Sequence, residues 1–191
     1  TVKDNVAALG FKTTHGYVPT ADYTPSYDAT VVARLRKAGA IVLGKTNLPC
    51  LAKDYQTHNL IFGVTNNPWN LSRTPGGSTG GGAAAVAAGL SPLEIGNDLG
   101  GSLRIPAHFC GIYGVKPTER LIPRTGIIPG LPKTVRQSLR HLTSMGPLAR
   151  SVDDLKLCLK ILAGPDGIDV DVPPVSLIEP KESHHSREIL M

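Results

Sequence analysis

Residues 96–107 of the chain read Gly-Asn-Asp-Leu-Gly-Gly-Ser-Leu-Arg-Ile-Pro-Ala, and they decide how the rest of the sequence is interpreted. The paired glycines before Ser102 allow a tight turn in which successive backbone N–H groups can approach a bound group. Acyl-transfer chemistry needs such a turn, because the amides hold the oxyanion while a hydroxyl attacks. The segment therefore predicts a nucleophilic serine at Ser102.

A second segment of the same character lies upstream, where residues 75–85 read Pro-Gly-Gly-Ser-Thr-Gly-Gly-Gly-Ala-Ala-Ala. It matches the Gly-x-Ser-x-Gly nucleophile elbow around Ser78, but that motif needs a preceding strand and residues 70–75 make a poor one. A phosphate-binding P-loop would need a Lys after the glycines, and neither segment has it. Each segment alone could also be a tight turn in a Gly-rich core.

Helix and strand patterns alternate around these segments. The expected elements are a helix from Asp28 to Gly39, an apolar strand over Ala40–Leu43, a small-residue helix over Ser78–Gly89 and a strand over Leu93–Ile95. A further helix is expected after Ser151, capped by the Ser151/Asp154 pair and ended by Gly164-Pro165. This alternation predicts an α/β fold with a mixed, largely parallel sheet covered by helices. Residues 1–167 form the expected core, and the Pro-rich, polar residues 168–191 are expected to be a linker or a disordered tail.

Composition excludes several classes of protein. No run of about 18 apolar residues exists, so we expect no transmembrane segment. Three scattered cysteines suit neither a disulfide framework nor a zinc site, and they favour a reducing, cytoplasmic location. The net charge of +5 is concentrated between residues 116 and 150, where seven basic residues face one acidic residue. Because no aromatic residues interleave with them, nucleic acid is not an expected partner.

Together the two glycine–serine segments resemble the amidase signature family, whose hallmark is Gly-Gly-Ser-Ser-Gly-Gly followed by Asp-x-Gly-Gly-Ser-x-Arg-x-Pro. Further matching stretches are Gly44–Asn47, Thr65–Asn70, Phe109–Gly111, Gly114–Thr118 and Gly146–Leu155. The resemblance runs from Val2 to about Asp166. It implies the amidase signature fold and the hydrolysis of a carboxamide.

The resemblance also assigns roles. Ser102 corresponds to the nucleophile that forms an acyl-enzyme, Ser78 to a bridging serine held by a cis peptide bond, and Lys3 to the catalytic base. The backbone of Leu99, Gly100 and Gly101 corresponds to the oxyanion hole, and Asp98 and Arg104 are expected to pin the nucleophile loop. No metal ion or organic cofactor is implied. His108, the histidine nearest to Ser102, is expected to be structural.

The sequence departs from the family in length and at single positions. Asn97 stands where Thr or Ser is common, Thr79 replaces the second serine of the hallmark, and Cys50 stands where many members have Glu. Members are usually more than twice as long, so we expect a partial domain. The expected partners are a small amide substrate, the remainder of the fold in the same or another chain, and a second copy in a homodimer. Two alternatives to a free-standing amidase stay open: the glutaminase component of a glutamyl-tRNA amidotransferase, and an inactive truncated homologue that acts by association.

Overall fold

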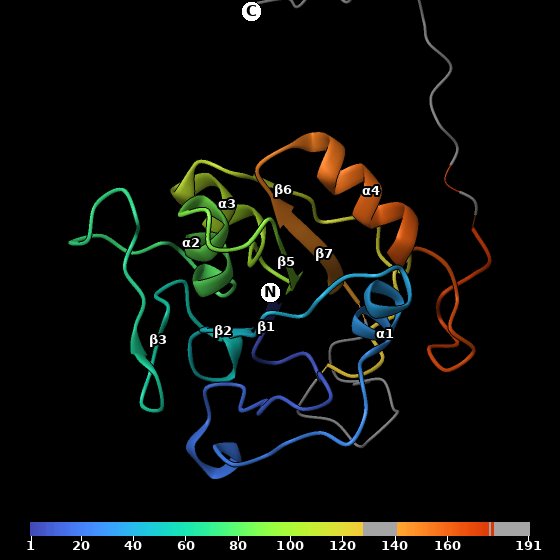
Figure 1. The fold of residues 1–191 in the computed structure, drawn as a ribbon, viewed down its shortest axis with the longest axis horizontal. Coiled ribbons are helices and arrows are strands. Elements are labelled where there is room, and N and C mark those ends of the chain that lie inside the picture. The colour runs from blue at the N-terminus through green and yellow to red at the C-terminus, as the bar shows by residue number, and fades with distance from the viewer. Residues whose placement is uncertain (128–140, 176, 178–191) are drawn as a thin grey trace, which may run out of the picture.

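The computed structural model describes residues 1–127, 141–175 and 177. A five-stranded sheet forms the middle layer, with helices on both faces (Figure 1). In the order β2-β1-β5-β7-β6, its strands are Lys45–Thr46, Val2–Lys3, Leu93–Asp98, Ser144–Ala149 and Tyr113–Gly114. β1 pairs parallel with β2 and β5, and β7 pairs antiparallel with β5 and β6. Within this sheet β7 therefore runs against the other four strands, which confirms the mixed, largely parallel sheet.

Four helices cover the sheet in two pairs. α1 (Thr30–Lys37) and α4 (Val152–Leu162) pack on the face that carries Val2 and Ile95, and α2 (Gly80–Ala87) and α3 (Arg104–Cys110) pack on the other. The other elements of the described residues are the 3-10 turns η1 (Val18–Thr20) and η2 (Cys50–Ala52) and the hairpin of β3 (His58–Asn59) with β4 (Gly63–Val64). No helix in the described ranges is long and apolar enough to cross a bilayer.

The small residues of α2 let this helix approach the sheet closely. A Cβ at Gly81 would overlap the backbone of Asn47, and one at Gly82 would overlap the carboxyl group of Glu94. The helix predicted over residues 78–89 is therefore present, and its glycines bring its N-terminal turn close to β2 and β5. This close packing positions Ser78, which immediately precedes the helix.

The predicted capping of α4 is also present. The Ser151 hydroxyl accepts a hydrogen bond from the Asp154 N–H at 3.1 Å, as an N-cap should. At the other end the helix stops at Leu162, and Gly164 takes a positive φ of 95°. The Arg34 side chain donates to the carbonyls of residues 162–165 and so holds this end against α1.

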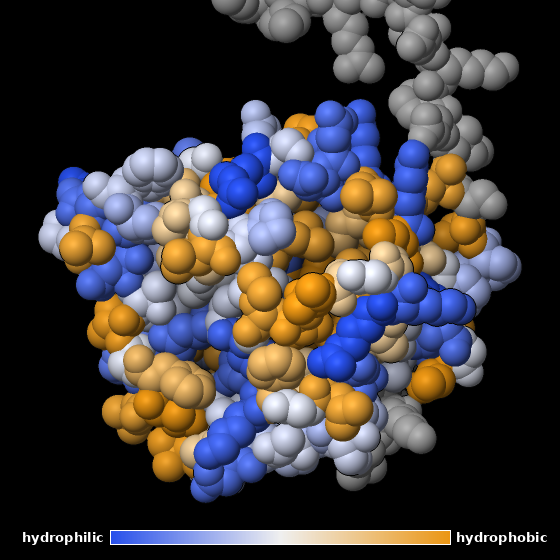
Figure 2. Space-filling model, in the orientation of Figure 1, coloured by the Kyte–Doolittle hydropathy of each residue, from blue (hydrophilic) through white to orange (hydrophobic). Residues whose placement is uncertain are grey.

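The strand expected over Ala40–Leu43 is wrong. Pairing with β1 begins only at Lys45, because the register Val2↔Lys45 leaves residues 40–43 without a partner strand in the described part of the chain. Ile41 is 83% exposed, and with Val42 and Leu93 it lines an apolar groove of about 410 Å³ beside β1. Figure 2 shows apolar side chains gathered at the centre of this face. In this chain, the apolar residues 40–43 therefore line a groove open to solvent and do not form an internal strand.

The core extends beyond the boundary predicted at residue 167. Asp169 is 2% exposed and accepts hydrogen bonds from the backbone and side chain of Arg124, and Val172 is buried as well. Arg124 belongs to the basic stretch, so part of the charge excess serves internal ion pairing. Most of the expected tail, residues 178–191, lies outside the described residues, as do Lys133, Arg136 and Arg140 of the basic stretch.

Candidate active site

Lys3 lies on the central strand of the three neighbouring parallel strands, and its side chain is completely buried. Its Nζ donates to Ser78 Oγ at 2.7 Å and to Asn97 Oδ1 at 3.0 Å. Burial lowers the pKa of Lys3 to about 7, against the opposing effect of the nearby charges of Glu94 and Asp98. An amine with this pKa is largely uncharged just above neutral pH, so it can accept a proton.

Ser78 sits at the turn that leads into α2, and only 1% of it is exposed. The peptide bond between Gly77 and Ser78 is cis. The turn is held from outside, because Thr57 Oγ1 donates to the Gly76 carbonyl at 2.7 Å and the backbone of residues 54–55 packs directly on Gly77. The serine hydroxyl is thus fixed beside the Lys3 amine.

Ser102 occupies the loop between β5 and α3 and is partly exposed. Its carbonyl accepts a hydrogen bond from the Thr79 N–H at 3.1 Å, which joins the nucleophile loop to the Ser78 turn. The hydrogen bonds of Lys3 bring in partners that lie 75 and 94 positions further along the chain. Lys3 and Ser78 are buried, whereas Ser102 is partly exposed to solvent.

Asp98 organises the loop that carries Ser102. It accepts hydrogen bonds from the backbone N–H groups of Gly101, Leu103 and Arg104, and from the Arg104 side chain at 2.9 and 3.0 Å. Burial opposes ionisation of Asp98, but these donors outweigh it and lower its pKa to about 2. A permanent carboxylate at the base of the loop therefore fixes the turn around Ser102.

This network changes one expectation about the oxyanion hole. The Gly101 N–H, expected among its donors, points instead to Asp98 Oδ1 at 2.8 Å. An N–H that is committed to a buried carboxylate is a poor donor to a second anion. Of the three predicted positions, Leu99 and Gly100 remain as candidate donors.

Two residues of the site were missed as participants by the sequence analysis. Asn97 links Lys3 to Asn5, because its Oδ1 accepts from Lys3 and its Nδ2 donates to Asn5 Oδ1 at 3.1 Å. In the sequence, only the presence of Asn where Thr or Ser is common could have pointed to a role for Asn97. Tyr55 lies 45 positions upstream of Gly100, yet its hydroxyl donates to the Gly100 carbonyl at 2.8 Å. Nothing in the local sequence pointed to that contact.

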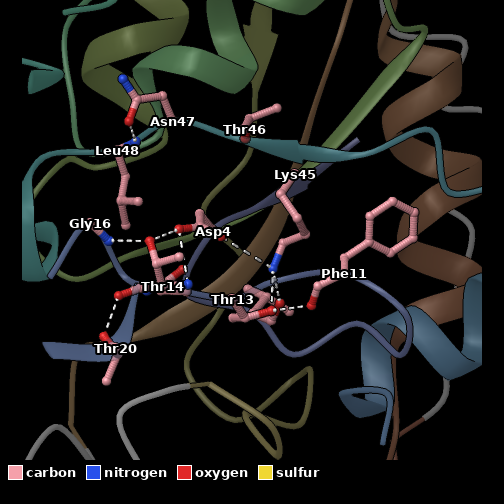
Figure 3. Close-up of polar contacts among 12 residues, drawn as sticks. Asp4, Phe11, Thr13, Thr14, Gly16, Thr20, Lys45, Thr46, Asn47 and Leu48 are labelled. Carbon is pink, nitrogen blue, oxygen red and sulfur yellow. Dashed lines mark hydrogen bonds and ion pairs between the residues drawn. The ribbon is translucent and has the colours of Figure 1, made fainter. Parts of the chain in front are cut away.

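A second, largely buried lysine lies next to the site, on β2. Lys45 Nζ donates to the Val6 carbonyl and to Thr13 Oγ1 at 2.9 Å, and lies 3.9 Å from Asp4 Oδ1. Figure 3 shows Asp4 between this amine and Thr14, whose backbone N–H and hydroxyl both donate to Asp4 Oδ2. The network anchors the chain that leaves β1 directly after Lys3.

The other candidate groups lie elsewhere. His108 is exposed on α3, with its ring 6.0 Å from that of Phe109. Within the described residues, no three His, Cys, Asp or Glu side chains are grouped as metal ligands. The contacts at the site therefore join the Lys3 amine to the Ser78 hydroxyl, and the Ser78 turn to the backbone of the loop that carries Ser102.

Comparison with known proteins agrees with this geometry. The family model described as Amidase matches residues 1–189. The A subunit of the glutamyl-tRNA(Gln) amidotransferase of Thermus thermophilus is 47% identical over 176 residues, which cover 91% of this chain and 36% of the relative. The chain thus spans about a third of the length of such relatives.

Solved structures show the same fold. The crystal structure of the glutamyl-tRNA(Gln) amidotransferase A subunit from Thermotoga maritima matches with a TM-score of 0.83 and 38% identity, over 92% of this chain and 37% of that one. The native peptide amidase from Stenotrophomonas maltophilia matches with a TM-score of 0.79 and 39% identity, over 90% and 34%. Because the family model covers nearly the whole chain and the neighbours share its fold, this chain is a partial domain that belongs to the amidase signature family.

Proposed function

We propose that this chain carries the catalytic centre for hydrolysis of an amide C–N bond, with Ser102 as nucleophile, Ser78 as proton relay and Lys3 as base. The observation that carries the proposal is the buried 2.7 Å hydrogen bond between Lys3 Nζ and Ser78 Oγ. A buried amine with a pKa of about 7 and a hydroxyl as its neighbour is arranged to accept a proton.

The reaction follows from that proton path. Uncharged Lys3 accepts the proton of Ser78 while Ser78 accepts that of Ser102, so the Ser102 oxygen attacks the amide carbon. As the tetrahedral intermediate collapses, the C–N bond breaks and the proton returns along the same path to the leaving amine. Water then attacks the acyl carbon and gives its proton to the relay; as the bond between that carbon and the Ser102 oxygen breaks, the relay returns the proton to Ser102 and the acid is released.

The proposed role of the loop around Ser102 is to stabilise the charge that develops in the transition state. Negative charge develops on the carbonyl oxygen in the transition state, and the N–H groups of Leu99 and Gly100 are the proposed donors to it. Asp98 and Arg104 act on this charge only through the shape of the loop, since Asp98 is fully buried and saturated with donors. Their proposed role is positioning.

The names of the sequence relatives support a second candidate for the biological role. Eight curated relatives, 40–47% identical to this chain, are each the A subunit of a glutamyl-tRNA(Gln) amidotransferase. In that role the same centre would release ammonia from glutamine, and the chain would work with other subunits. The apolar groove lined by Ile41, Val42 and Leu93 offers a surface for the rest of the fold or for a partner chain.

Labelling with a fluorophosphonate tests the chemistry that both candidates share. The full chain should be labelled at Ser102, and the Ser102→Ala variant should not. A folded protein that stays unlabelled at Ser102 would support the third alternative, an inactive homologue that acts by association. Ammonia release from glutamine, against acid release from a panel of simple amides, then separates the amidotransferase role from a free-standing amidase.

A further inference from the structure

Glu94 on β5 is a buried acid that the proposed reaction does not use. None of it is exposed, and its Oε1 accepts a hydrogen bond from Thr46 Oγ1 at 2.5 Å. Its Oε2 has no hydrogen-bond partner among the described residues. A carboxyl group placed in this way costs folding free energy, so its presence beside the site needs a physical explanation.

The strand order places this carboxyl group over β1. Thr46 belongs to β2 and Glu94 to β5, and β1 lies between these two strands. Their hydrogen bond therefore spans β1, on the face where Lys3 projects, since Lys3 pairs with Thr46 and paired residues of parallel strands share a face. α2 closes the space from above, because Gly82 packs directly on the carboxyl group. Glu94 and Lys3 thus share one water-excluded compartment.

Few other charges reach this compartment. Lys45 on β2 is also near Glu94, but its amine is held by Val6, Thr13 and Asp4. Asp98 on β5 is balanced by Arg104. The α-amino group of Thr1 faces Glu94 as well, but burial lowers its pKa, and it donates to Ser91 and to the Leu93 carbonyl. Burial raises the pKa of Glu94, and the Thr1 α-amino group, Thr46 and Lys3 oppose that rise. For Lys3, Glu94 is the nearby charge with the largest effect on its pKa.

We propose that Glu94 is a positioning residue that acts as the counter-charge of Lys3 and sets how strongly Lys3 holds a proton. The inference rests on the proposed function only in taking Lys3 as the base. Burial lowers the pKa of Lys3 and raises that of Glu94, so it pulls both groups toward their uncharged forms, and the charge of each opposes this effect on the other. The balance leaves Lys3 uncharged in the resting site yet basic enough to take the proton of Ser78. Without Glu94, Lys3 would be a weaker base.

The direct test is an NMR titration of the Lys3 side chain in the full chain with labelled lysines, with the Lys3 signal assigned from a Lys3→Met variant. Glu94→Gln keeps the size and the acceptor for Thr46 but removes the charge. We expect the Lys3 midpoint to move to lower pH by about one unit, because two charges in a protein interior interact by about that much. An unchanged midpoint in folded Glu94→Gln protein would overturn the proposal.

Two further variants keep the test decisive. Glu119→Gln makes the same change on a residue that pairs with Arg120 and His141, and it should leave the Lys3 midpoint unchanged. If Glu94→Gln does not fold, Thr46→Val removes the hydroxyl that stabilises the ionised carboxyl group, so a smaller downward shift is expected, and no shift contradicts the proposal. The titration needs no turnover, so it can succeed even if Ser102 proves not to be the nucleophile.

Discussion

Lys3 is completely buried and Lys45 largely buried, and although these lysines sit on neighbouring parallel strands, their surroundings differ. Lys3 on β1 donates to a serine hydroxyl and an asparagine side chain, whereas Lys45 on β2 donates to a backbone carbonyl and a threonine hydroxyl and faces Asp4. Burial lowers the pKa of both, to about 7 for Lys3 and to about 8 for Lys45. Burial alone therefore does not distinguish a base from an anchor.

The difference lies in where a proton can go. The partner of Lys3 is Ser78, whose turn is joined by backbone hydrogen bonding to Ser102 at the partly exposed loop. The hydroxyl partner of Lys45, Thr13, sits in a network that closes on Asp4 and Thr14 within the fold. Under the proposed mechanism the Lys3 amine is therefore linked through Ser78 toward Ser102, whereas the Lys45 amine is linked to Asp4 and Thr13 and to no serine hydroxyl among the described contacts.

Removing each amine in turn tests whether Lys3 and Lys45 differ in function, and the largest effect is expected here. Lys3→Met should lower kcat by about 10⁴-fold, the upper end of what a general base contributes, because Ser78 loses its proton acceptor. Lys45→Met should leave kcat per folded molecule within a few-fold of the parent. Steady-state rates on the full chain, normalised to folded protein, make the measurement. Equal losses in both variants would show that the two lysines are not functionally distinct.

Stability should respond in the opposite order. Lys45→Met should lower the free energy of unfolding by about 3 kcal/mol, because it leaves the buried Asp4 carboxyl group without its cation. Lys3→Met leaves the neutral acceptors of Ser78 and Asn97 unpaired and also removes the amine opposite Glu94, but with a pKa of about 7 that amine is only partly charged, so the loss should be smaller. Urea unfolding of both variants checks this order, and a larger loss for Lys3→Met would contradict it.

This contrast also marks how far the sequence alone could reach. The glycine–serine segments carried the resemblance to the amidase signature family, and that resemblance, with the alternation of helices and strands, predicted the fold class, the sheet type and the Lys3–Ser78 neighbourhood. Asn97, Tyr55 and Glu94 could not be predicted, because their contacts join residues 45 to 94 positions apart or depend on which strand lies between two others. The apolar run at residues 40–43 misled for the same reason: composition indicates burial without indicating the partner that covers it.

The pH dependence gives a smaller but directional effect. In the proposed reaction Lys3 works only when uncharged, and its pKa of about 7 means that protonation would remove the base as the pH falls through 7. We expect kcat/KM to fall about tenfold per pH unit below that point and to level off above it. Measuring kcat/KM against pH with an uncharged amide substrate locates the pH at which this fall begins. A fall that begins near the ordinary lysine value, about 10.4, would mean that Lys3 is not desolvated during catalysis.

The smallest expected effect concerns the outer edge of the site. The Gly100–Gly101 peptide is held at both ends, by the Tyr55 hydroxyl on its carbonyl and by Asp98 on its N–H. Tyr55→Phe removes a hydrogen bond worth about 1 kcal/mol, while the hydrogen bond to Asp98 remains. We expect kcat to fall about fivefold and KM to stay nearly unchanged, because a shifted loop weakens transition-state stabilisation more than substrate binding. Tyr113→Phe, at a similarly exposed tyrosine on β6, is the matched control and should change neither constant. If Tyr55→Phe instead raised KM alone, Tyr55 would contact substrate and would not position the loop.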